Sequence, residues 1–225
     1  MKVLITSATT LEIKPLLETL QFEARLNAHL TRYKYQKYKI DILITGVGMV
    51  PTAFLMGQTL QAGKYDAALN FGIAGSFQRD IPIGEVLHVT SDQFPELGAE
   101  NGEYFLSLLD LKLLEENCFP FKNGELINEN PVSSSTIARL KTVRAITVNT
   151  ISGNENKIEL LKNRFNPALE SMEGAAFLYA CLSEGIPCAQ LRAVSNYVEP
   201  RDTKKWNIPL AIEKLNHTIL SILHE

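Results

Sequence analysis

Short runs of apolar and β-branched residues alternate with longer segments of helical periodicity from one end of the chain to the other. The apolar runs predict strands at residues 3–6, 40–45, 67–71, 85–90, 142–147 and 188–194. The longer segments predict helices at residues 11–20, 50–62, 103–116, 156–164, 173–184 and 204–224. The polar, alternating segment 33–41 predicts an early antiparallel hairpin. This order predicts an α/β fold with a mixed, largely parallel, twisted sheet and helices on both faces.

The whole chain, residues 1–225, is expected to form a single domain. Its 225 residues are 45% hydrophobic, which is enough for one sizeable core, and no repeat or linker divides them. The segment 91–102 is expected to be a loop because Pro95, Gly98 and Gly102 interrupt regular structure. Ligands of such sheets bind at the carboxyl ends of the strands, so chemistry is expected just after each strand.

Charge and composition exclude several classes of function. The formal net charge is −3 and the basic residues are scattered, so no nucleic-acid partner is expected. No apolar run spans a bilayer, and Glu12 comes too early for a secretory signal, so a cytoplasmic location is expected. The three cysteines lack CxxC spacing and the four histidines lack metal-ligand spacing, so free thiols and no metal site are expected.

Two glycine-containing turns follow predicted strands. Gly46-Val47-Gly48 resembles the start of a dinucleotide-binding loop, but Pro51 replaces its third glycine, and the chain has no GxxxxGK[ST] loop. The second turn, residues 70–76 (NFGIAGS), is either a tight turn or a place where the backbone approaches a ligand closely, which glycine permits.

Three polar residues stand at the ends of predicted elements, and each has an ordinary explanation. Glu12 could be a solvated glutamate of the first helix. Glu173 could be a first-turn acid that the helix dipole favours. Asn196, after the last predicted strand, could make an Asx turn.

The combination of these features resembles the nucleoside phosphorylase and nucleosidase superfamily along nearly the whole chain. The resemblance lies in SATTLEI after the first strand, GVGMV, NFGIAGSF, the helix start SMEGAAF and the strand end RAVSN. Within the superfamily, the single-domain nucleosidases that hydrolyse thioadenosine nucleosides are similar, with a glutamate at Glu12, a Met-Glu pair at Met172-Glu173 and an arginine at Arg192.

Two departures from this pattern refine the expected activity. The phosphorylases carry an arginine-bearing phosphate loop after the first strand, whereas this chain has Ser7-Ala8-Thr9-Thr10 and no arginine before Arg25, so water is the expected nucleophile. Asn196 stands where the thioadenosine nucleosidases have aspartate, and its amide can donate to the carbonyl of a 6-oxopurine such as hypoxanthine.

Two loops narrow the resemblance further. Residues 195–202 with Trp206, and residues 91–100, look like those of the futalosine hydrolases, nucleosidases of menaquinone biosynthesis that release hypoxanthine from futalosine. The resemblance implies an N-glycosyl hydrolase that needs no cofactor and acts on a small-molecule purine nucleoside. It also implies a homodimer or a higher homo-oligomer, and whether a neighbouring subunit completes the pocket is left open.

The resemblance also implies roles for individual residues. Glu12 would be the general base for water, Arg192 would position that water, and Glu173 would bind the ribose hydroxyls and stabilise a cationic sugar. Asn196 would hold the departing base. The remaining substrate contacts would come from Phe71, Ile73, Ala74, Gly75, Ile151, Met172 and Ser195, although core packing is an alternative for Phe71 and Met172.

The carboxylate at the far end of futalosine also requires a partner. Arg201 would bind it through a bidentate contact, with Lys204 as a neighbouring candidate; a solvated loop arginine is the alternative. Three other functions stay open: a thioadenosine nucleosidase, a purine nucleoside phosphorylase, and a non-catalytic nucleoside-binding protein of the same fold.

Overall fold

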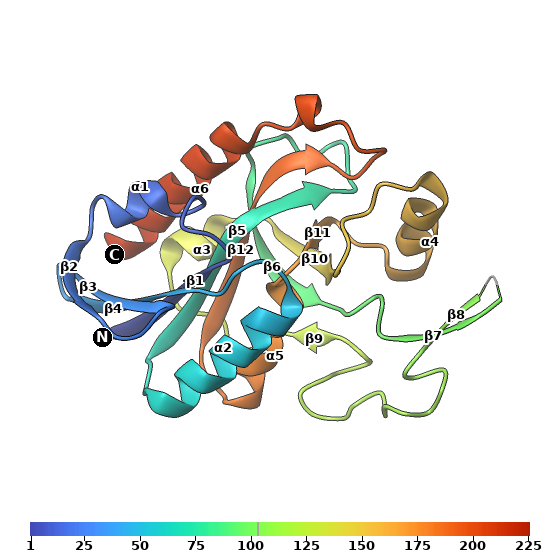
Figure 1. The fold of residues 1–225 in the computed structure, drawn as a ribbon, viewed down its shortest axis with the longest axis horizontal. Coiled ribbons are helices and arrows are strands. Elements are labelled where there is room, and N and C mark those ends of the chain that lie inside the picture. Colours follow the sequence, from blue (N-terminus) through green and yellow to red (C-terminus); the bar gives the residue numbers. More distant parts are fainter. Residues whose placement is uncertain (103) are drawn as a thin grey trace.

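The computed structural model describes residues 1–102 and 104–225 and shows an α/β architecture built on one large mixed sheet (Figure 1). The sheet strands are β1 (Lys2–Ser7), β2 (Gln21–Arg25), β3 (Leu30–Tyr35), β4 (Tyr38–Ile44), β5 (Ala67–Ser76), β6 (Val86–Asp92), β9 (Leu126–Ile127), β10 (Thr142–Thr147), β11 (Leu169–Ser171) and β12 (Cys188–Tyr197). Their order is β11-β10-β6-β12-β5-β1-β4-β3-β2, with β9 beside β6. The predicted fold class is confirmed.

The strands pair in both directions. β1 runs parallel to β4 and β5, β5 is parallel to β12, and β10 is parallel to β6 and β11. β12 and β6 are antiparallel, as are β3 and β4, which form the hairpin expected at residues 33–41. β11 also pairs with β5, antiparallel, so β5, β12, β6, β10 and β11 close into a ring.

Helices cover both faces of the sheet (Figure 1). They are α1 (Lys14–Leu17), α2 (Met49–Ala62), α3 (Ser135–Arg139), α4 (Glu155–Phe165), α5 (Gly174–Ser183) and α6 (Ile208–Leu223), with a 3₁₀ turn at Thr203–Lys205. Along β1, Val3 and Ile5 pack in the core beneath α1 and α6, whereas Leu4 packs in the core beneath α2 and α5. A strand buried on both faces has a continuous apolar sequence, which explains why β1 was predictable, whereas the short strands β9 and β11 and the exposed β2 were not predicted.

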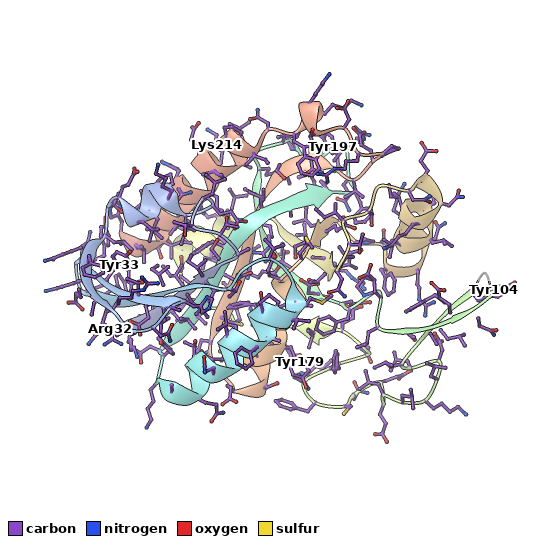
Figure 2. The ribbon with its side chains drawn as sticks, in the orientation of Figure 1. Arg32, Tyr33, Tyr104, Tyr179, Tyr197 and Lys214 are labelled. Atoms are coloured by element: carbon purple, nitrogen blue, oxygen red, sulfur yellow. The ribbon has the colours of Figure 1, made fainter. Side chains whose placement is uncertain are left out.

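The helix predicted at residues 103–116 is wrong. Glu103 lies outside the described residues, and the chain continues as β8 (Tyr104–Ser107), paired with β7 (Gly98–Asn101), and then as turns. Asp110 accepts hydrogen bonds from the backbone N–H and hydroxyl of Ser107, and Lys112 has a φ of 56°. This β7–β8 arm extends away from the sheet, with Tyr104 at its far end (Figures 1 and 2), so a helix there would have no core against which to bury its leucines.

Two other helices are shorter than predicted. α1 begins at Lys14 instead of residue 11, because the preceding residues form a turn around the Glu12 carboxylate. α6 begins at Ile208 instead of residue 204, where the Asn207 side chain caps it and a proline occupies its first turn. Over the ranges 1–102 and 104–225, no helix is both long enough and apolar enough to cross a membrane.

Candidate active site

A cavity of about 280 Å³ opens at the carboxyl ends of β1, β5, β11 and β12. It lies at the sheet edge where the sequence predicted chemistry. Nine of the predicted site residues line it: Glu12, Ile73, Ala74, Gly75, Ile151, Met172, Glu173, Ser195 and Asn196. These residues come from five separate segments of the chain, which only the fold brings together.

Glu12 is held in a turn by four hydrogen-bond donors. Its Oε2 atom accepts bonds from the Ser7 hydroxyl (3.1 Å), the Thr9 N–H (2.9 Å) and the Thr9 hydroxyl (3.0 Å). Its Oε1 atom accepts from the Ile73 N–H at 3.2 Å. The side chain is buried, and the Glu12 carbonyl accepts a 2.8 Å bond from the Asn216 amide of α6. Glu12 is therefore a fixed acceptor in the cavity wall and not a solvated helix glutamate.

Glu173 precedes the first residue of α5, and its carboxylate does not bond to its own helix. Instead, Oε1 accepts a 2.9 Å hydrogen bond from the N–H of Gly48. Gly48 has a φ of 103°, a conformation that glycine adopts readily, so the GVG turn is what presents this N–H. Burial raises the pKa of Glu173, and the positive charge of Arg192 partly offsets that effect.

Arg192 is almost wholly buried on β12, behind the cavity wall. Its guanidinium donates to the Asn70 amide oxygen and, at 3.1 Å, to the Leu191 carbonyl. Burial lowers the pKa of Arg192, and the charges of Glu173 and Glu12 oppose that shift. A buried charge is costly unless it is compensated, so the arginine and these carboxylates stabilise one another.

Gly72 permits the arginine and Glu12 to approach the same point of the backbone. A side-chain carbon at Gly72 would lie 3.2 Å from Glu12 Oε1 and 3.3 Å from Arg192 Nη1. A side chain there would therefore require the two charged groups to shift by a few tenths of an ångström. Residues 70–76 are not the turn that the sequence predicted but the second half of β5, and a close approach of their backbone to a ligand stays a prediction.

Ser195 and Asn196 stand where β12 loses its regular register with β5, between Val194 and Asn196. Such irregularities redirect side chains, and here both line the cavity. The Ser195 hydroxyl donates to the Asn196 amide oxygen at 2.8 Å, and the Asn196 amide nitrogen donates to the Tyr197 carbonyl at 3.0 Å. The neighbouring Tyr197 lies at the upper end of β12 in Figure 2.

Three predicted residues lie outside the cavity wall. Phe71 is fully buried in the core beneath α6, where its packing alternative places it. Arg192 is buried behind the wall. Arg201 lines a smaller adjoining hollow of about 40 Å³, and its guanidinium lies 5.0 Å from the centre of the Trp206 ring. Its carboxylate-binding role stays a prediction.

Sequence reasoning missed several lining residues. Glu170 is buried between the cavity and the adjoining hollow, and its carboxylate accepts bonds from the Ser152 N–H (2.9 Å) and hydroxyl. Burial raises the pKa of Glu170. The sequence did contain a signal for Glu170, because it is an acidic residue within the short apolar segment that precedes Ser171-Met172. Apolar wall residues were also missed: Leu11, Val47, Trp206, Ile208 and Ile212.

Comparisons with known proteins agree with this architecture. The futalosine hydrolase of Streptomyces coelicolor is 32% identical over 185 residues, covering 80% of this chain and 76% of that protein. The futalosine hydrolase of Thermus thermophilus is 31% identical over 189 residues, covering 81% and 80%.

Solved structures of nucleosidases share the fold. A futalosine hydrolase of Helicobacter pylori has a TM-score of 0.82 at 19% identity, covering 100% of this chain and 97% of that one. A methylthioadenosine/S-adenosylhomocysteine nucleosidase of Colwellia psychrerythraea, in complex with adenine, has a TM-score of 0.81 at 20% identity, covering 100% and 95%. A sequence model of the phosphorylase superfamily matches residues 2–224, and the chain belongs to that superfamily.

Proposed function

We propose that this chain hydrolyses the N-glycosidic bond of futalosine, releasing hypoxanthine and dehypoxanthine futalosine, a step of menaquinone biosynthesis. The broader class is secure: the chain is a purine nucleoside N-glycosyl hydrolase of the phosphorylase superfamily. The observation that carries the finer proposal is the amide of Asn196 in the cavity wall. An amide can donate to a purine carbonyl and accept from N7–H, which suits a 6-oxopurine.

Hydrolysis, and not phosphorolysis, is supported by the charges around the cavity. Among its lining residues in the described part of the chain there is no Lys or Arg, and Ser7 and Thr9 direct their bonds to Glu12. A phosphate nucleophile would therefore meet three buried carboxylates, those of Glu12, Glu170 and Glu173, without a charge-assisted partner in the wall. Water carries no such cost.

The sugar end of the cavity supports the following steps. Glu12 takes a proton from water as the oxygen attacks the anomeric carbon. The C–N bond breaks, its electron pair leaves with the purine, and the purine takes up one proton, so that the OH of water ends on the sugar and an H on the released base. Glu173 accepts hydrogen bonds from the ribose hydroxyls, and its negative charge stabilises the oxocarbenium-like sugar. The positive charge of Arg192 behind the wall partly offsets burial, which raises the pKa of Glu173.

The base end supports the choice of hypoxanthine. Glu170 and Asn196 both line the region shared by the cavity and the adjoining hollow. A 6-oxopurine presents an N1–H donor and a carbonyl acceptor, so a carboxylate and an amide together match it. Adenine has no hydrogen on N1, and its amine replaces the carbonyl.

The opposite wall supports a large apolar group at the far end of the sugar. Leu11 and Val47 are exposed at the cavity, and Ile208 and Ile212 of α6 complete an apolar surface. An aromatic chain such as the one in futalosine would bury this surface. We also expect a homodimer or a higher oligomer, because Val50 and Phe54 of α2 are exposed beside Val47.

The test is a panel of nucleosides offered with and without inorganic phosphate. Futalosine, inosine, adenosine and methylthioadenosine are compared by identifying the released base and the sugar. We expect the highest kcat/KM for futalosine, hypoxanthine as the base, a free sugar, and no effect of phosphate. A sugar 1-phosphate product would refute hydrolysis, and preference for methylthioadenosine would refute the futalosine assignment.

A further inference from the structure

The N-terminus of α5 is capped by residues that do not belong to the cavity's predicted chemistry. Glu173 is the N-cap residue, the position from which a side-chain oxygen, most often that of Ser, Thr, Asp or Asn, accepts a bond from an N–H group of the helix's own first turn. Here those groups have other partners. The Gly174 N–H donates to the Ser171 hydroxyl at 3.3 Å, and the Ala175 N–H donates to the Thr147 hydroxyl at 2.8 Å. The Glu173 side chain is thereby left to bond with Gly48.

The Thr147 hydroxyl is itself oriented by a buried acid. It donates to Oδ1 of Asp92 at 2.9 Å, so its single proton is committed there and its lone pairs face the Ala175 N–H. Asp92 is fully buried at the end of β6; its other oxygen accepts a 3.0 Å bond from the Gln190 amide. The negative charge that favours a helix N-terminus is thus supplied by Asp92 through Thr147.

Gly174 brings this network against the helix start. A side-chain carbon there would lie 2.2 Å from the Gln190 amide oxygen and 2.5 Å from Asp92 Oδ2. Both contacts are far shorter than real side-chain carbons allow. The first helical residue must therefore be glycine if Asp92 and Gln190 are to stay where they are.

We propose that Asp92 and Thr147 are positioning residues, which take over the capping of α5 so that the Glu173 carboxylate faces the sugar end of the cavity. This inference rests on the proposed function only in assigning Glu173 to the ribose. Without the Thr147 hydroxyl, the Ala175 N–H would lack an acceptor two residues from Glu173. The Glu173 carboxylate would turn back to satisfy it and would leave Gly48.

The decisive variant is Thr147→Val, which removes the hydroxyl and keeps the shape of the side chain. We expect kcat/KM for futalosine to fall about tenfold, whereas Thr147→Ser, which keeps the hydroxyl, should stay within about twofold. Asp92→Asn should reduce kcat/KM less, because it removes the charge but leaves the Thr147 hydroxyl. The control is Ile219→Val in the core beneath α6, which lowers stability without touching the network and should leave kcat/KM unchanged.

A double-mutant cycle separates positioning from a general structural effect. In a Glu173→Ala background, Thr147→Val should have almost no further effect on the residual kcat/KM, because the residue through which it acts is gone. Equal loss in both backgrounds, or no loss in the wild-type background, would overturn the inference.

A crystal structure of Thr147→Val tests the inference independently of activity. The Glu173 carboxylate should bond to the Ala175 N–H and no longer to the Gly48 N–H; an unmoved carboxylate would overturn the inference. If the carboxylate turns as expected but Glu173→Ala retains full turnover, the capping inference stands, and it is the proposed role of Glu173 in catalysis that fails.

Discussion

Replacing Glu12 with glutamine tests the central assignment, because the surroundings of this side chain determine what the amide can do. The four donors around the carboxylate divide three to one: Ser7 and Thr9 supply the three bonds to Oε2, and the Ile73 N–H alone bonds to Oε1. The amide will therefore place its oxygen at the Oε2 position. Its NH₂ group then faces the Ile73 N–H, which loses its acceptor.

This geometry sets two magnitudes for Glu12→Gln. One buried N–H without an acceptor costs about 1–3 kcal/mol of folding free energy. For a domain of this size, that cost lowers the midpoint of thermal unfolding by about 2–12 °C. The amide cannot take a proton from water, so kcat should fall by roughly 10²–10⁴.

The assay is release of hypoxanthine from futalosine at a temperature well below both unfolding midpoints, with thermal unfolding followed separately. Glu18→Gln is the matched control, because Glu18 is an exposed glutamate at the end of α1. Glu18→Gln should change neither kcat nor the midpoint of thermal unfolding. A near-normal kcat for Glu12→Gln would refute the general-base role, whatever happens to its stability.

Three further predictions concern the surroundings of the cavity. Arg201→Ala should lower kcat/KM for futalosine by about one to two orders of magnitude and leave inosine cleavage almost unchanged; equal losses on both would show that the arginine supports its loop instead. Glu170→Gln should lower kcat/KM by about tenfold or more for 6-oxopurine nucleosides but not for adenosine, and a uniform loss measured on both would contradict base recognition. Burial raises the pKa of Asp92 to about 6, so the folded protein binds this proton more tightly than the unfolded chain does. This stabilisation is complete below about pH 4 and is lost as the pH rises through about 6. The free energy of unfolding in urea should therefore depend less steeply on pH in this window for Asp92→Asn than for the wild type. The same slope in both proteins would argue against a raised pKa of Asp92.

The long apolar strands β1, β5 and β12 were predictable from the sequence, and the β7–β8 arm was not, for one physical reason. Strands buried on both faces must be apolar throughout, so β1, β5 and β12 stand out as continuous runs. The leucines of segment 103–116 have helical spacing as well, but spacing does not tell whether a core exists to receive them. Here local bonds between Ser107 and Asp110 prevail.

The candidate site was predictable only where its residues follow strands in recognisable motifs. Glu12, Glu173 and Asn196 meet that condition. Glu170 does not, because its place in the wall depends on β11 pairing with both β10 and β5, and an irregular three-residue strand leaves little trace in a sequence. The apolar wall is assembled from residues nearly two hundred positions apart, such as Leu11 and Ile208.

The closed ring of five strands restricts how a substrate can enter and leave. β11, which carries Glu170, is hydrogen-bonded on both sides, so it cannot swing outward without breaking two strand pairings at once. We expect local opening instead at the rim where the exposed side chains of Leu11 and Val47 border the cavity. Hydrogen exchange should report this asymmetry: amides of β11 should exchange only on global unfolding, and those of the Gly46–Gly48 turn through local opening. We therefore expect the wall at Glu170 to stay rigid and a ligand to enter and leave past Leu11 and Val47.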